Sequence, residues 1–87
     1  MDILRNASAG TMESSDAYVE ITPGTGVQIQ LESVVAQQFG QAIDAVVREV
    51  LVEQGVQNAN VRVVDRGALE CVIRARVETA ILRGKGE

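Results

Sequence analysis

The side chains best suited to chemistry gather in one short segment near the N-terminus, Glu13-Ser14-Ser15-Asp16. A serine hydroxyl is a weak nucleophile until a base removes its proton, and near neutral pH that base is most often a histidine. The chain contains no histidine, so Ser14 or Ser15 would depend on Glu13, Asp16 or a lysine for activation. The sequence therefore argues against a self-contained hydrolase.

A serine that another enzyme modifies has no such requirement, because that enzyme supplies the base and needs only a reachable hydroxyl. The segment 9–16 has neither a helical nor a strand period, and we expect residues 1–16 to form an exposed loop. Ser-Ser-Asp before a strand is also typical of an ordinary turn or a local side-chain cap. Spacing alone leaves both interpretations open, the modification site and the turn.

The composition indicates one small domain. A chain of 87 residues is too short for two hydrophobic cores. Hydrophobic residues make up 46% of it but aromatic residues only 2%, so Val, Ile, Leu and Ala must fill the core, which suits a sheet with a helix packed on it. Cys71 stands alone, which excludes an intrachain disulfide, and its apolar neighbours predict a buried thiol.

Charge and hydropathy narrow the classes of partner. The formal net charge is −4 and the basic residues are scattered, which argues against a nucleic-acid surface. The Cys and His spacings of metal sites are absent. No apolar run approaches the ~20 residues that span a bilayer, and the N-terminus lacks the apolar core of a signal peptide. We expect a soluble, cytoplasmic protein that binds proteins or small molecules and neither a membrane nor a metal.

Two patterns in the first two thirds of the chain predict regular structure. Residues 18–22 and 27–32 alternate apolar and polar side chains on either side of Pro23-Gly24-Thr25-Gly26, which predicts a hairpin. From Ser33 the apolar residues recur at steps of three and four, which predicts a helix of about 21 residues. Ser33 is its expected N-cap, and Gly55 its expected left-handed residue after the C-terminus.

The last third is harder to interpret. Residues 61–64 and the turn Asp65-Arg66-Gly67 predict a second hairpin. Residues 69–82 fit a strand and a helix equally, so we divide them into a strand to about residue 75 and a short helix from about 76 to 82. Residues 84–87 form an expected flexible tail. The predicted fold is α+β: a small single domain over 1–87, with a mainly antiparallel sheet of two hairpins, one long helix across it and a short C-terminal helix.

Three blocks of the sequence resemble one family. Ile3 and residues 7–16, especially Ala-Gly-Thr-Met-Glu-Ser-Ser-Asp at 9–16, resemble the N-terminal signature of the citrate lyase acyl carrier protein, the gamma subunit of that complex. Residues 34–43 resemble the family's helix, and residues 65–76 resemble its C-terminal block. Together these blocks are distributed over residues 3–76, which is most of the length of the chain.

The resemblance implies a covalent site. In that family a serine of the first block is esterified through a phosphodiester to phosphoribosyl-dephospho-coenzyme A, and the corresponding position here is Ser14. Family members usually have glycine between this serine and the aspartate at position 16. This chain has Ser15 there, which adds a second and less favoured candidate hydroxyl.

The resemblance also implies a function, that of a non-catalytic carrier. Such a protein presents acetyl and citryl thioesters to the transferase (alpha) and lyase (beta) subunits while citrate is cleaved to acetate and oxaloacetate, and a prosthetic-group transferase loads it. The alternatives are a carrier of citramalate lyase, a carrier of malonate decarboxylase, which typically has Gly-Ser-Gly-Asp at the site, and a non-carrier α+β regulatory or binding domain. Helical pantetheine carriers are excluded, because their serine follows an aspartate at a helix start.

Overall fold

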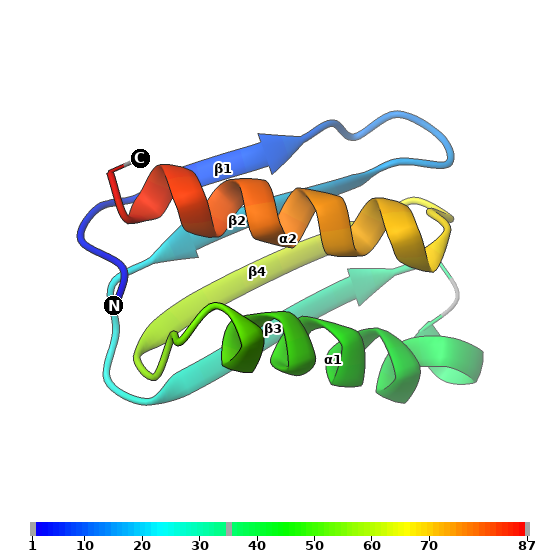
Figure 1. Ribbon diagram of the computed structural model, residues 1–87. Coiled ribbons are helices and arrows are strands. Elements are labelled where there is room, and N and C mark those ends of the chain that lie inside the picture. The colour runs from blue at the N-terminus through cyan, green and yellow to red at the C-terminus, as the bar shows by residue number, and fades with distance from the viewer. Residues whose placement is uncertain (1, 35, 87) are drawn as a thin grey trace.

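Strand β4 (Ala59–Asp65) lies inside a four-stranded sheet in the computed structural model, which describes residues 2–34 and 36–86. The strand order is β1-β2-β4-β3, with β1 at Ala7–Gly10, β2 at Ala17–Thr22 and β3 at Val27–Ser33. β1 pairs with β2, and β2 with β4, in antiparallel orientation, whereas β3 runs parallel to β4. Both helices, α1 (Ala36–Glu53) and α2 (Glu70–Gly84), cover one face of this sheet (Figure 1).

The predicted hairpin between residues 18–22 and 27–32 is wrong, although both strands exist. β2 and β3 do not pair with each other, because β4 lies between them: Val63 of β4 is opposite Val19 of β2 and Leu31 of β3. β4 takes the inner position because Val61, Val63 and neighbouring residues are buried. β3 exposes alternate polar side chains and lies at the edge. Helix α1 is then the crossover that a parallel pair requires.

The long helix is confirmed, but its predicted start is wrong. Helix α1 has 18 residues and buries the later part of the predicted face, Ile43, Val46, Val47, Val50 and Leu51. Phe39 and Ala42, which recur at the same steps, are exposed. Gly55 follows it with a φ of 71°, as expected. Ser33 ends strand β3, and its hydroxyl donates a hydrogen bond of 2.8 Å to the carboxylate of Asp65.

The second predicted hairpin is also wrong, because residues 70–84 form one helix. The side chains that α2 buries recur at helical steps, at Ile73, Val77, Ala80 and Ile81. Leu69, which fitted the strand pattern, is 72% exposed. Cys71 is exposed as well, so the buried thiol expected from its apolar neighbours is wrong: Cys71 faces away from the sheet.

The two ends of the chain are more ordered than expected. Within the predicted loop 1–16, residues 7–10 form β1, whose small Ala9 is buried beneath α2. Gly84 is a buried residue of α2, and the Lys85 ammonium donates a hydrogen bond of 2.6 Å to the Gln54 carbonyl, so the expected tail begins later. The last position of that tail, residue 87, lies outside the described residues.

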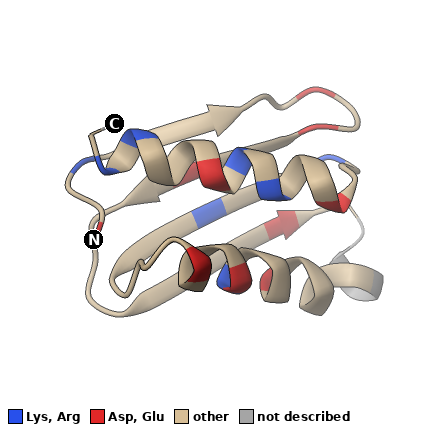
Figure 2. Cartoon of the chain, in the orientation of Figure 1, with Lys and Arg blue, Asp and Glu red and all other residues tan. Residues whose placement is uncertain are grey.

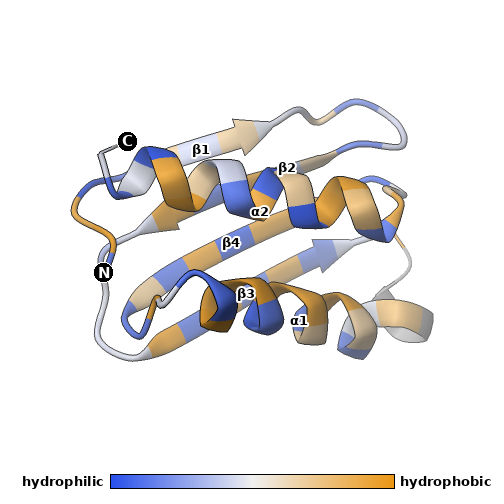
Figure 3. Cartoon of the chain, viewed as in Figure 1, coloured by the Kyte–Doolittle hydropathy of each residue, from blue (hydrophilic) through white to orange (hydrophobic). Residues whose placement is uncertain are grey.

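A single core lies between the sheet and the two helices. Its largest buried side chains are aliphatic, including Ile21, Leu51 and Ile81. Both helices bury apolar side chains against the sheet, and Figure 3 shows hydrophobic and hydrophilic positions alternating along them. The opposite face of the sheet carries polar side chains such as Gln28, Gln30 and Asn60. The predicted α+β class and mainly antiparallel sheet are therefore confirmed. Among the described residues, no helix is both long and apolar enough to cross a membrane.

Candidate functional site

Ser14 lies at the tip of the connection between β1 and β2. The Asp16 N–H donates a hydrogen bond of 3.2 Å to the Glu13 carbonyl, which closes a four-residue turn with Ser14 and Ser15 in the middle. Ser15 has a φ of 66°. A positive φ at the second central residue is the mark of a type II turn and favours glycine there. The turn expected from Ser-Ser-Asp is therefore present, and it displays the first serine at its tip.

Both serine side chains are exposed. The Ser14 hydroxyl forms no hydrogen bond with any residue that the structure describes. The backbone of Ser15 is held, because its N–H donates a hydrogen bond of 2.8 Å to the Arg66 carbonyl. The turn thus combines a fixed main chain with an accessible, unengaged hydroxyl.

Asp16 fixes the base of the turn. Its carboxylate accepts hydrogen bonds from Thr11 Oγ1 at 2.6 Å and from the Ala17 N–H at 2.7 Å. The Arg76 guanidinium on α2 adds two more, Nε to Oδ1 and Nη2 to Oδ2, both at 3.0 Å. These contacts, that of Arg76 foremost, hold the pKa of Asp16 well below its usual range. An ionised carboxylate tied to four donors is a poor proton acceptor for either serine.

The loop between β4 and α2 holds the turn from its other side. The Arg66 N–H donates a hydrogen bond of 3.0 Å to the Asp16 carbonyl, in addition to the contact between the Arg66 carbonyl and Ser15. The buried Asp65 carboxylate fixes this loop in turn, since it accepts from the Gly67 and Ala68 N–H groups at 3.1 and 2.8 Å. The β1–β2 loop therefore lies beside the start of α2 (Figure 1).

Gly10 closes the hairpin that presents the turn. Its φ is +93°, and a Cβ atom built there would lie 1.9 Å from the Ala17 carbonyl oxygen. No side chain fits so close to a backbone atom. Gly10 therefore has a steric role that its place in the sequence segment 9–16 does not reveal.

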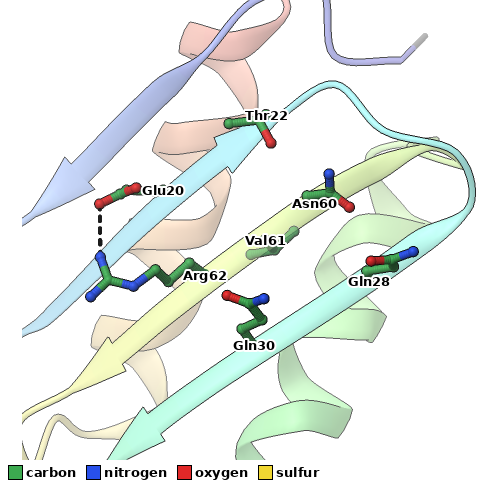
Figure 4. Close-up of a pocket in the computed structure, with 7 residues that line it drawn as sticks. All are labelled: Glu20, Thr22, Gln28, Gln30, Asn60, Val61 and Arg62. Carbon is green, nitrogen blue, oxygen red and sulfur yellow. Dashed lines mark hydrogen bonds and ion pairs between the residues drawn. The ribbon is translucent and has the colours of Figure 1, made fainter.

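A hollow on the open face of the sheet offers no competing chemistry. A shallow hollow of about 260 Å³ lies on the open face of the sheet and is lined by polar side chains such as Gln28, Gln30 and Asn60 (Figure 4). Its charged residues, Glu20 and Arg62, form an ion pair of 2.9 Å. Within residues 2–34 and 36–86 no three Cys, Asp or Glu side chains are grouped as metal ligands. The arrangement best suits a hydroxyl that accepts a group from another enzyme.

Comparisons with known proteins match nearly the whole chain. Residues 4–84 match the family described as the malonate decarboxylase delta subunit. The citrate lyase acyl carrier protein of Klebsiella pneumoniae is 55% identical over 85 residues, which cover 95% of this chain and 88% of that protein. The protein of the same name from Haemophilus influenzae strain PittEE is 49% identical over 87 residues, covering 100% and 92%.

A solved structure shares the fold. It is the crystal structure of a Pseudomonas malonate decarboxylase hetero-tetramer in complex with malonate, of which one chain superposes with a TM-score of 0.77. The sequence identity is 22%, and the superposition covers 92% of this chain and 84% of the other.

Proposed function

This chain belongs to the family of the citrate lyase acyl carrier proteins, and we propose that Ser14 is the residue through which it carries its prosthetic group. Carrier subunits of this family are typically non-catalytic, hold their prosthetic group covalently and work within multi-subunit complexes. The observation that carries the proposal is the exposed Ser14 hydroxyl at the tip of a turn whose main chain is held on both sides.

Ser14 suits the attachment better than Ser15 does. Ser14 is the first central residue of the turn, and its hydroxyl has no partner among the described residues. Ser15 has the strained positive φ, and its backbone is tied to Arg66. The contact with Arg66 involves only the main chain of Ser15, and both serine side chains are exposed. Ser14 ranks first because it lies at the first central position of the turn and corresponds to the modified serine of the family signature.

The group we propose is phosphoribosyl-dephospho-coenzyme A, joined to Ser14 by a phosphodiester. When bound, its thiol carries the acyl chain as a thioester, and this chemistry belongs to the cofactor. The residues of this chain hold and present it: the contacts of Asp16 with Thr11 and Arg76 fix the base of the turn that carries Ser14. Such tethering converts capture of the acyl group by successive active sites into an intramolecular event with a raised effective concentration.

The partners we propose are the transferase and lyase subunits of citrate lyase, with a prosthetic-group transferase that loads Ser14. The relatives that carry this name are 49 to 55% identical to the chain. Malonate decarboxylase is the second candidate complex, since the matched family is described by its delta subunit. The chain in the malonate decarboxylase structure is only 22% identical, so the citrate complex ranks first.

Loading of the purified apo protein tests the site. We would incubate wild type, Ser14→Ala and Ser15→Ala with the transferase and the activated prosthetic group, then measure intact and peptide masses. We expect wild type and Ser15→Ala to gain the adduct and Ser14→Ala to remain bare. Both substitutions are exposed and should change stability by less than about 0.5 kcal/mol. A full adduct on Ser14→Ala would overturn the assignment.

Reconstitution then tests the complex. The loaded protein, mixed with the alpha and beta subunits of citrate lyase, should restore citrate cleavage, and Ser14→Ala should not. The matched control is the same protein mixed with the remaining subunits of malonate decarboxylase. If it restored malonate decarboxylation and not citrate cleavage, the second candidate would replace the first.

A further inference from the structure

Arg66 differs from every other basic residue of the chain. The sequence has eight lysine and arginine residues, all within the described part. Four arginines pair with carboxylates: Arg48, Arg62, Arg74 and Arg76. Three further basic side chains donate to backbone carbonyls: Arg5, Arg83 and Lys85. The Arg66 side chain contacts none of the described residues through a hydrogen bond or an ion pair.

This unengaged cation is exposed beside the candidate attachment turn. The Arg66 carbonyl accepts from the Ser15 N–H at 2.8 Å, and its own N–H donates to the Asp16 carbonyl at 3.0 Å. Two hydrogen bonds therefore hold the Arg66 backbone against the residue that follows Ser14. Figure 2 shows acidic positions on the β1–β2 loop, which these two hydrogen bonds join to the segment that leads into α2.

Other cations hold two of the acids near Arg66, which leaves the Arg66 charge available to an anion. Glu32 lines the same surface hollow as Arg66 and pairs with Arg62 at 3.3 Å. Asp16 is neutralised by the two hydrogen bonds from Arg76, so the Arg66 charge is not needed there. A phosphodiester on Ser14 would add a permanent negative charge to a chain whose net charge is already −4 and next to the exposed acid Glu13. A guanidinium suits that charge, because its planar fork of donors matches two phosphate oxygens.

We propose that the Arg66 guanidinium binds the phosphate through which the prosthetic group is joined to Ser14. The proposal rests on the function proposed above and adds a second residue to the site. Arg66 positions the base of the arm; it takes no part in the chemistry of the thiol. The two backbone hydrogen bonds of Arg66 keep the base of its side chain beside Ser15 and Asp16.

Nuclear magnetic resonance of the ¹⁵N-labelled protein, before and after loading, tests the contact directly. We expect the Nε–H signal of Arg66, assigned by its loss in Arg66→Lys, to shift and to exchange more slowly with water once Ser14 is modified. The Nε–H of Arg48 is the control in the same spectrum, since it lies on α1 and already donates to Asp44 at 2.7 Å. A complete adduct on Ser14 with an unmoved Arg66 signal would overturn the proposal.

Loading kinetics give a second readout. Arg66→Gln should be loaded about 2- to 5-fold more slowly than wild type, which is the scale of an exposed ionic contact, and Arg48→Gln should match wild type. The difference should shrink at high salt. Slow loading of Arg66→Gln together with an unmoved Nε–H signal would assign Arg66 to contact with the transferase and overturn the phosphate contact. Failure of wild type to load would instead refute the proposed function, and the mass measurement reports that first.

Discussion

Replacement of Gly10 by alanine should destabilise the protein more than the same change at any glycine with open space around it. Two costs combine at Gly10. A φ of +93° disfavours an L-residue by roughly 1–2 kcal/mol. The new Cβ would also lie 1.9 Å from the Ala17 carbonyl oxygen and 3.1 Å from Arg76 Cδ, and overpacking of this kind costs about 1–3 kcal/mol. Together we expect a loss of about 2–5 kcal/mol.

Gly67→Ala is the matched control. Gly67 has a nearly equal φ of +89°, but nothing lies within 4 Å of its Cβ position. The free energy of unfolding of Gly67→Ala should therefore fall only by the cost of a positive φ for alanine, about 1–2 kcal/mol. Urea unfolding of wild type and both variants, with midpoints compared at an unchanged slope, measures the two losses.

Loading of Ser14 in the folded variants distinguishes a distorted turn from a general loss of stability. A displaced Ala17 carbonyl moves the residue next to Asp16, so folded Gly10→Ala should be loaded more slowly than folded Gly67→Ala. If both variants unfold at the same urea concentration, the close approach of Gly10 to Ala17 adds nothing to the loss of stability, and the reasoning is refuted.

Three further predictions concern the turn and the start of α2. Ser15→Gly should raise the free energy of unfolding by about 0.5–1 kcal/mol in urea titrations, because glycine adopts a φ of 66° without the steric cost; a loss of stability would contradict the turn geometry. The pKa of Asp16 is depressed in the folded state from the ordinary value of 3.8, so its ionised form stabilises the fold above about pH 4 and that contribution is lost as the pH falls. The stability of wild type relative to Asp16→Asn should therefore shrink from pH 7 to pH 3, and parallel pH profiles would refute the contact with Arg76. Cys71 is exposed, so a thiol reagent such as dithionitrobenzoate should label it in the native protein without prior unfolding, and protection of the native thiol would contradict its position on α2.

Local patterns predicted the elements better than their pairing. Period-two alternation located β2 and β3, and the helical period located α1. Each of these segments buries one face, and its apolar residues therefore recur with the period of a strand or of a helix. The pairing of β2 with β3 was wrong because Pro23 to Gly26 reads as a hairpin connection. The contrary signal was a strand, a long helix and a second strand in succession, 27–33, 36–53 and 59–65, which is the pattern of a parallel unit.

The errors at both ends of the chain have a common cause. Between Leu69 and Ala75 the apolar residues alternate by chance, and only the spacing of Ile73, Val77 and Ala80 reports the buried face of α2. Strand β1 consists of Ala-Ser-Ala-Gly, which has little intrinsic strand propensity. It forms because an open edge of β2 and the overlying α2 accept small side chains. Tertiary packing decides such segments, and a single sequence does not display it.

The candidate site was predictable in its residues and hidden in its contacts. Ser14 and Ser15 stand out by type and by resemblance to a family signature. Nothing in the spacing of Asp16 and Arg76, which are 60 positions apart, shows that they meet. The same holds for Arg66, since only the hydrogen bonds to Ser15 and Asp16 bring the β4–α2 loop against the turn.

These contacts extend from the core to the attachment turn. Asp65 is buried at the end of β4, accepts from Ser33 of β3 at 2.8 Å and fixes the loop that follows. That loop places Arg66, and Arg66 holds the backbone of the turn. A carrier needs mobility in order to visit several active sites, yet this turn is held by α2 as well as by the sheet. With the prosthetic group on Ser14, as proposed, the mobility would belong to the arm rather than to the protein. A change in Asp65 should accordingly weaken loading of Ser14, although no atom of Asp65 is exposed enough to meet the enzyme that performs it.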